Sequence, residues 1–140
     1  MITGVVGITL WTSDLGRMFD FYHRLLRLPL HSRHDDFVAF ELGDVRFNVG
    51  LHDRVFGASA DPYRVMPHLG VDDIQGEYRR LKEEGVEFIR PPEREHWGGW
   101  IATLKDPDGN ILQLLQLPRG DYPIRNAVPF PPGFGCQPIV

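Results

Sequence analysis

The sequence has only one cysteine, Cys136, so no disulfide bond can form within the chain. It also has no apolar run near the ~20 residues that a membrane-spanning helix requires. Its N-terminus lacks a charged segment followed by an apolar segment, the pattern typical of a secretory signal. These absences predict a cytoplasmic protein with no membrane partner.

A strong charge of either sign is missing as well. The chain has 15 Lys and Arg residues against 19 Asp and Glu residues, a formal net charge of −4. Nucleic-acid-binding domains normally carry a basic stripe, so we expect no nucleic-acid partner. The composition, 42% hydrophobic and 24% charged, is that of an ordinary globular protein. At 140 residues the chain fits one domain.

An internal repeat is the most informative feature that the sequence does contain. Residues 7–26 read as a strand, an aspartate and a helix, and residues 66–85 repeat that order. Asp14 and Asp73, the two aspartates, are 59 positions apart. The repeat indicates two copies of one building block, and a site formed between copies is the natural place to seek function.

Each copy is predicted to have the order β-α-β-β-β. In the first copy we expect strands at about 5–11, 28–33, 36–42 and 45–51, with a helix that ends near Leu26. In the second, a helix capped by Asp72 or Asp73 and closed by Gly85 precedes strands at 86–89, 100–105 and 111–117. Proline offers no amide hydrogen to a sheet, so Pro91 and Pro92 should end or divert the first of these strands.

Residues 118–140 differ in composition from the rest of the chain. This tail is rich in proline and glycine but also contains apolar side chains such as Tyr122, Phe130 and Phe134. It is either loosely draped over the surface or packed through its aromatic residues on the body or on a second protomer. The predicted domain therefore covers residues 1–117, as modules at about 4–53 and 63–117.

Three motifs, taken in order, carry a family resemblance. They are the Ser13-Asp14-Leu15 segment with Phe21-Tyr22, the Val71-Asp72-Asp73-Ile74 segment, and Asp106-Pro107-Asp108-Gly109-Asn110 before the last strand. Over about residues 4–117 the chain resembles the vicinal oxygen chelate superfamily, which includes glyoxalase I, bleomycin-binding proteins and extradiol dioxygenases. The resemblance implies an α+β fold of two βαβββ modules that form an open, cup-like, eight-stranded mixed sheet, usually in a homodimer.

The same resemblance implies where a divalent metal would bind in active members. Four side chains hold it, one near the start of each module and one on each module's last strand. In this sequence those positions fall on Gly7, Asn48, Met66 and Gln113, which are all neutral. A hard dication needs carboxylates or imidazoles to replace its hydration shell. We therefore predict no metal site and no cofactor, with a shifted site at His68 and Gln113 as the main fallback.

The resemblance places the four inherited metal positions inside the cup and the segment before the seventh strand at its mouth. Strand side chains alternate between two faces, so residues two positions from an inherited position share its face. Together these expectations give the candidate ligand-binding residues. They are Thr9, Trp11, Asn48, Met66, His68, Trp97, Trp100 and Gln113. His68 is also the candidate catalytic residue, because imidazole can act as an acid or a base near neutral pH. Each candidate has a structural alternative: a hydrogen-bonded core histidine, satisfied core amides, or a tryptophan that only fills the core.

The segment before the seventh strand adds further candidates. Trp97 and Trp100 flank two glycines, so they could provide aromatic walls where a ligand approaches the backbone closely. Glu93, Glu95 and His96 could supply an acid or a base, or could simply form a solvated loop.

Three functional hypotheses follow. The first is a metal-free protein that binds a small apolar or aromatic molecule in the cup, like the bleomycin-binding relatives. The second is an enzyme, namely a lyase, isomerase or extradiol-type dioxygenase that uses His68 or a relocated metal. The third is a module retained for assembly, with the tail as a docking strap. Whether the protein is an enzyme stays open at this point.

Overall fold

The computed structural model describes residues 1–118. The tail at 119–140, and with it both interpretations of its role, lies outside the described residues. The chain divides into two compact units between Ala60 and Asp61, within the connection between the two repeats. Each unit is described separately.

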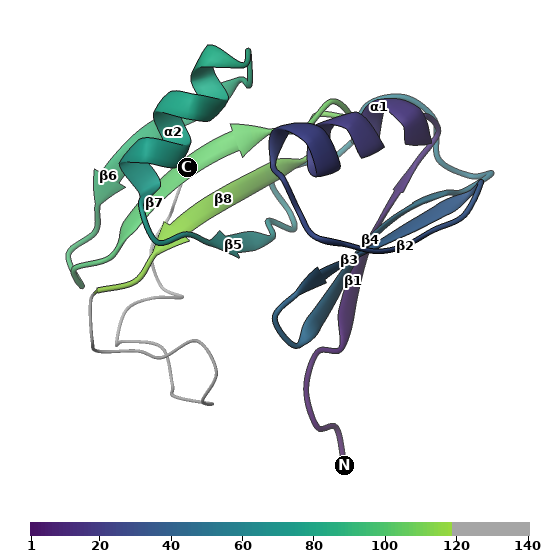
Figure 1. Cartoon of the computed structure of the whole chain (residues 1–140), viewed down its shortest axis with the longest axis horizontal. Coiled ribbons are helices and arrows are strands. Elements are labelled where there is room, and N and C mark those ends of the chain that lie inside the picture. The colour runs from purple at the N-terminus through teal and green to yellow at the C-terminus, as the bar shows by residue number, and fades with distance from the viewer. Residues whose placement is uncertain (119–140) are drawn as a thin grey trace. The chain divides into compact units, whose positions relative to one another are not determined.

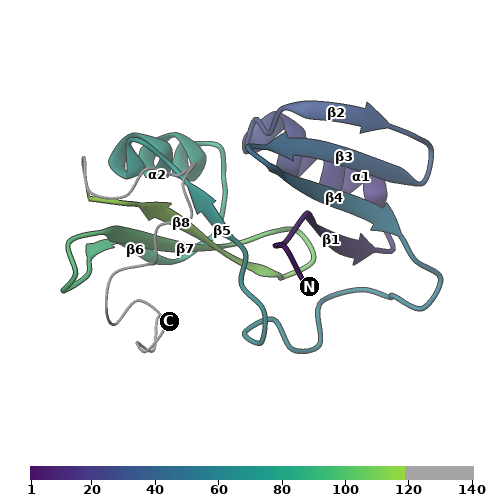
Figure 2. The ribbon, with the colours of Figure 1, turned by 90° about the horizontal axis from the view of Figure 1, so that it is seen from below.

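Unit 1 contains the first copy of the repeat. Its elements are β1 (Gly7–Thr12), α1 (Leu15–Phe19), the π-helical segment η1 (Asp20–Leu25), β2 (Leu30–Arg33), β3 (Phe37–Leu42) and β4 (Val45–Leu51). They form a four-stranded sheet (Figure 1) in the order β1-β4-β3-β2, which can be followed in Figure 2. Strand β1 runs parallel to β4, and the other neighbouring strands are antiparallel.

Unit 2 has the same plan. It consists of β5 (His68–Gly70), α2 (Ile74–Glu83), β6 (Phe88–Arg94), β7 (Trp100–Lys105) and β8 (Ile111–Gln116), with the strand order β5-β8-β7-β6. Strand β5 is parallel to β8, and the remaining pairs are antiparallel. The predicted α+β class and the duplication are confirmed. The eight expected strands are present, four in each of two mixed sheets.

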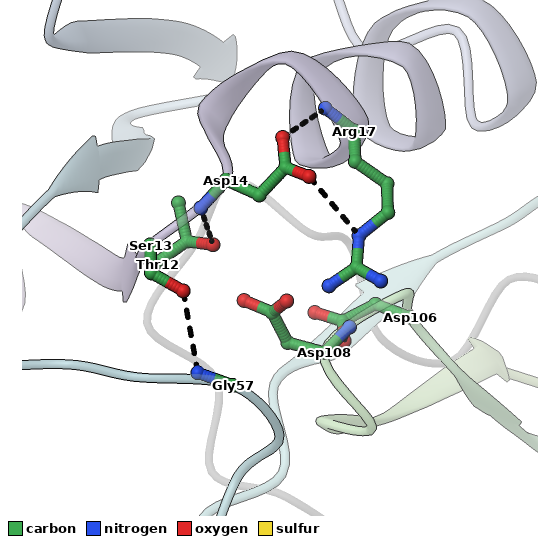
Figure 3. A network of polar contacts seen from close by, with 7 residues as sticks. All are labelled: Thr12, Ser13, Asp14, Arg17, Gly57, Asp106 and Asp108. Atoms are coloured by element: carbon green, nitrogen blue, oxygen red, sulfur yellow. Dashed lines mark hydrogen bonds and ion pairs between the residues drawn. The ribbon is translucent and has the colours of Figure 1, made fainter.

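Each helix begins at the predicted aspartate. The Asp14 carboxylate accepts the backbone N–H of Arg17 at 3.1 Å, and the Asp73 carboxylate accepts that of Gly76 at 3.1 Å. These bonds satisfy amide hydrogens that have no partner within the first turn. Figure 3 shows the Asp14 cap, together with the bond from Asp14 N to the Thr12 hydroxyl at 3.0 Å.

The connection after β4 is tied to the same corner of unit 1. The backbone N–H of Gly57 donates to the Ser13 hydroxyl at 3.2 Å, 44 residues along the chain (Figure 3). The segment that begins α1 is therefore fixed by hydrogen bonds to the end of β1, to the first turn of the helix and to the connection after β4.

The first helix departs from the regular α-helix that its apolar spacing predicts. After Phe19 it widens into a π-helix, in which Leu26 N donates to Phe21 O at 2.9 Å. Phe21 and Tyr22, which are adjacent in the chain, are both buried and meet edge to face at 5.0 Å. The extra residue in a π turn allows two adjacent aromatic side chains to enter the core.

Pro91 and Pro92 were expected either to end strand β6 or to divert it. The strand does not end there. It continues to Arg94 as an edge strand. Its pairing with β7 shifts register between Phe88 and Arg90 and again between Arg90 and Glu93. Proline is tolerated at such an edge because the missing amide hydrogens are not needed by a neighbouring strand.

Each helix lies against one face of its own sheet (Figures 1 and 2). In unit 1 the Tyr22 ring contacts Phe47 with 5.2 Å between centroids. In unit 2 the side-chain oxygen of Gln116 accepts the N–H of Ile74 at the start of α2, at 2.8 Å. Neighbouring strand residues point to opposite faces, so Asn48 and Gln113 lie on the face opposite their unit's helix. We call this the helix-free face of each sheet.

Within residues 1–118, none of the helices has the length and apolar character required to cross a membrane.

Candidate functional site

The helix-free face of unit 1 is arranged as three rungs across β1, β4 and β3. The strand register pairs Gly7 with Arg46, Thr9 with Asn48, and Trp11 with Gly50. On the other side of β4, Glu41, Ala39 and Phe37 complete the same rungs. The face therefore passes from charged through amide to aromatic residues along the strands.

The amide rung brings two predicted residues into contact. Asn48 Nδ2 donates to Thr9 Oγ1 at 3.3 Å, and both side chains are half-buried. The charged rung carries an ion pair between Arg46 and Glu41 at 3.3 Å. Neither partner of that pair is deeply buried, so its contribution to stability is small.

The aromatic rung contains Trp11, which was predicted, together with Phe37 and Gly50, which were not. The Trp11 and Phe37 rings lie 6.1 Å apart at an interplanar angle of 52°. Just beyond the end of β4, His52 meets Trp11 edge to face at 5.3 Å. Trp11 remains 43% exposed.

In unit 2 the corresponding position is a chain of three polar side chains. His68 is paired with Gln113 across β5 and β8, and Gln113 with Thr103 across β8 and β7. Gln113 Nε2 donates to Thr103 Oγ1 at 3.3 Å, and both side chains are buried. His68 lies on the edge strand β5 and is exposed, yet partial desolvation of its ring lowers its pKa below the usual 6.5, an effect that outweighs the hydrogen bond with Gln113.

Unit 2 also carries a charged cluster. Its carboxylates, Glu93 and Glu95, are among the predicted acid or base candidates, but its cation, Arg90, is not. Arg90 Nη2 donates to Glu93 Oε2 and to Glu95 Oε1, both at 2.8 Å. The Arg90 and Glu95 side chains are 19% and 10% exposed. Arg90 is in register with Thr103, so the cluster shares the helix-free face. Hydrogen bonding to Glu93 leads the effects that raise the pKa of Arg90, which therefore stays charged.

The structure separates the two tryptophans of the Trp-Gly-Gly-Trp segment. Trp97 covers Gly99, because a Cβ built at Gly99 would overlap its ring. Trp100 pairs with Gln116, whose side chain contacts α2, so it lies on the helix-covered side of the sheet. Met66 lies before β5 and is half-buried.

Among the predicted ligand-binding residues, the structure thus brings together Thr9, Trp11 and Asn48 in unit 1, and His68 and Gln113 in unit 2. Sequence reasoning missed Phe37, Gly50, Thr103 and Arg90. Alternation along β3 and β7 could have found Phe37 and Thr103 once the register was known. Arg90 reaches this face only through the register shift of β6, for which the sequence gives no signal.

The polar groups on these faces do not fit a hard dication. The Asn48 amide is bonded to the Thr9 hydroxyl, and the Gln113 amide to the Thr103 hydroxyl. The carboxylates of Glu93 and Glu95 are both bonded to Arg90. Within residues 1–118, no group of three or more His, Cys, Asp or Glu side chains is placed to hold a metal ion. Neutral amides alone compensate poorly for the hydration shell of such an ion.

Comparison with known proteins decides the family. A family model described as the Glyoxalase/Bleomycin resistance protein/Dioxygenase superfamily matches residues 4–114. The chain belongs to this superfamily. Solved members share its fold: one from Sphaerobacter thermophilus superposes with a TM-score of 0.67 at 26% identity, covering 83% of this chain and 98% of that one. A Nocardioides member gives 0.66 at 22% identity, covering 88% and 89%.

Two curated relatives match shorter segments of the chain. A bleomycin resistance protein of Klebsiella pneumoniae is 40% identical over 55 residues, 34% of this chain and 44% of that protein. An uncharacterized protein of Shewanella frigidimarina is 39% identical over 54 residues, 39% of each chain. These matches span less than half of either relative. YraH of Bacillus subtilis, also uncharacterized, is 23% identical over 123 residues, 79% of this chain and 95% of YraH.

Proposed function

We propose that this superfamily member binds a small, largely apolar or aromatic molecule on its helix-free faces, without the metal of its enzymatic relatives. The observation that carries the proposal is the amide at the centre of each face. Asn48 and Gln113 each donate to a threonine hydroxyl, in place of the carboxylates that a metal would require.

The surroundings of these amides support an aromatic ligand. Trp11 and Phe37 lie one rung from Asn48 in unit 1. Ligand pockets commonly combine apolar and aromatic walls with a few polar groups that fix orientation. A bleomycin resistance protein is among the relatives that this chain partly matches. The homodimer and the cytoplasmic location remain predictions.

A thermal-shift and tryptophan-quenching screen with a panel of aromatic compounds tests the proposal. At a concentration 100 times its Kd, a bound compound should stabilise the protein by about 2.7 kcal/mol. Trp11→Ala and Asn48→Ala should each weaken the response. Gly16→Ala, on the surface of α1, is the control, because an added Cβ there meets nothing closer than 3.8 Å. A broad panel that produces neither stabilisation nor quenching would refute binding.

One observation favours the second candidate, an enzyme that uses acid–base chemistry. His68 has its pKa lowered by partial burial and a hydrogen bond with Gln113 that orients the ring. A neutral imidazole near pH 7 is the form that can accept a proton from a substrate. If so, turnover of a ligand found in the screen should be lost in His68→Ala while binding persists.

A further inference from the structure

The strongest unassigned feature is Gly50, which lies beneath two aromatic rings. A Cβ built there would be 2.7 Å from Phe37 Cδ2 and 2.8 Å from Trp11 Cζ3. These separations are shorter than real Cβ contacts, so any side chain would force the rings away from β4. Gly50 is buried, whereas Trp11 above it is substantially exposed. We call Trp11, Phe37 and Gly50 the aromatic corner.

The corner has a shape that suits a flat ligand. Its two rings are inclined at 52° with centroids 6.1 Å apart. A planar aromatic molecule can stack on one ring and present its edge to the other, the two arrangements that aromatic pairs prefer. A puckered, saturated molecule of similar volume cannot do both. The absence of a side chain at Gly50 keeps the rings close enough to act together.

A polar group lies at a defined distance from the corner. The Asn48–Thr9 rung is two residues away along the strands, a separation of roughly 6.6 Å. The half-buried Asn48 amide donates one hydrogen to Thr9. A carboxamide has two hydrogens and an accepting oxygen, so it can bond both to Thr9 and to a ligand.

We propose that Gly50 is a specificity-determining residue, which holds the aromatic corner so that this face selects planar aromatic molecules with a hydrogen-bonding group about one rung, roughly 6.6 Å, from the ring centre. The inference rests on the proposed function, because it concerns a ligand on the same face. It adds the ligand's shape, its polar group and the residue that sets the preference.

Three matched probes test it by isothermal titration. They are 2-(2-naphthyl)ethanol, its decahydro analogue, which is not planar, and 2-propylnaphthalene, which lacks the hydroxyl. The wild type should bind the naphthyl alcohol about fivefold or more tightly than the decahydro analogue. It should also prefer the alcohol to 2-propylnaphthalene, and Asn48→Ala should remove that second preference.

Gly50→Ala should reduce the preference for the planar probe to less than about twofold. Phe37→Leu is the second variant: it keeps an apolar side chain on the half-buried site, leaves Gly50 intact and should cause the same loss. It decides the matter if Gly50→Ala does not fold. Gly16→Ala should keep the wild-type ratio.

Equal binding of planar and decahydro probes by the wild type would overturn the inference and leave the proposed function standing. Retention of the planar preference by Phe37→Leu would also overturn it. If none of the three probes binds the wild type, the inference fails, and the broad aromatic panel decides separately whether the proposed function fails as well.

Discussion

Arg90 is the cation on which two carboxylates of unit 2 depend. Its Nη2 atom bonds Glu93 and Glu95, and the Glu95 side chain is only 10% exposed. Arg90→Leu would leave Glu95 buried without its partner, which should lower the free energy of unfolding by about 3 kcal/mol. Urea denaturation monitored by circular dichroism measures this change.

The control for Arg90 is Arg64, whose ion pair with Asp61 is also short, at 2.7 Å, but exposed on both sides. Arg64→Leu should cost less than about 1 kcal/mol. Glu95→Gln removes the buried charge while keeping its shape, so it should be milder than Arg90→Leu. Equal effects of the Arg90 and Arg64 substitutions would show that burial of the cluster is energetically unimportant.

His68 makes the stability of the protein depend on pH in a defined direction. Partial burial lowers its pKa from 6.5 in the folded state, so the unfolded chain binds a proton more readily. Stability should therefore fall as the pH drops below 6.5 and through the folded pKa, while above 6.5 this group has no effect. Wild-type protein should lose more stability than His68→Asn between pH 7.5 and about 5.

An NMR titration of the imidazole provides an independent readout of the same effect. The His68 resonance should titrate below 6.5, the ordinary value for histidine. Gln113→Glu should shift that titration upward, because a carboxylate beside the ring favours the protonated form. A His68 pKa at or above 6.5 in the wild type contradicts the prediction and also weakens the case for His68 as a base.

At the scale of elements, we expect the energetic effects of substituting Asp73, the N-cap of α2, and Gly76, in its first turn, to depend on each other. A Cβ at Gly76 would be 2.5 Å from the Asp73 carboxylate that caps the helix. Alanine favours a helix by up to about 1 kcal/mol over glycine, and a lost aspartate cap costs about as much. Gly76→Ala should thus stabilise an Asp73→Ala background by about 1 kcal/mol but give much less in the wild type. Chemical denaturation of the four proteins of this double-mutant cycle measures the coupling.

Helix α1 offers the matched cycle without the clash. A Cβ at Gly16 would be 3.8 Å from the Asp14 carboxylate, an ordinary contact. The effects of Gly16→Ala and Asp14→Ala should therefore add within about 0.5 kcal/mol. Additivity at Gly76 as well would mean that the Asp73 side chain moves aside without losing its bond.

The elements that sequence predicts well are those defined by strong local chemistry. Asp14 and Asp73 cap their helices, Gly85 adopts a positive φ of 89° as a C-terminal glycine should, and β7 has the predicted bounds. The departures arise from tertiary packing. The π-helical turn accommodates Phe21 and Tyr22 in one core, and β6 passes two prolines because it is an edge strand.

At the scale of the whole molecule, the repeat predicts the fold but only part of the site. Alternation along β1 places Thr9 and Trp11 on one face, because a period of two needs no tertiary information. It likewise places Asn48 and Gly50 on one face of β4, but joining the two pairs requires the register between the strands. The role of Gly50 and the place of Arg90 could not be found in this way. Gly50 matters through rings that belong to other strands, and Arg90 joins its face through a register shift that only the fold determines.

The lack of negative charge at the centre of these faces predicts that the protein binds little or no divalent metal. The central amides are neutral and bonded to hydroxyls, so a divalent ion would lose hydration without gaining carboxylate ligands. Protein purified without chelators should contain well under one equivalent of Fe, Mn, Ni or Zn by elemental analysis. Dialysis against EDTA should leave its Tm unchanged, since a bound ion would stabilise the fold by RT ln(1 + [L]/Kd).

Gln113→Glu provides the contrasting case for the metal prediction. It places a carboxylate in register with His68, which supplies two ligands of the kind that divalent ions prefer. If the neutral amides are what excludes a metal, Zn²⁺ should raise the Tm of this variant more than that of the wild type. Stoichiometric metal in the wild-type protein would instead mean that His68 and Gln113 already suffice, and it would move the function toward the enzymes of the superfamily.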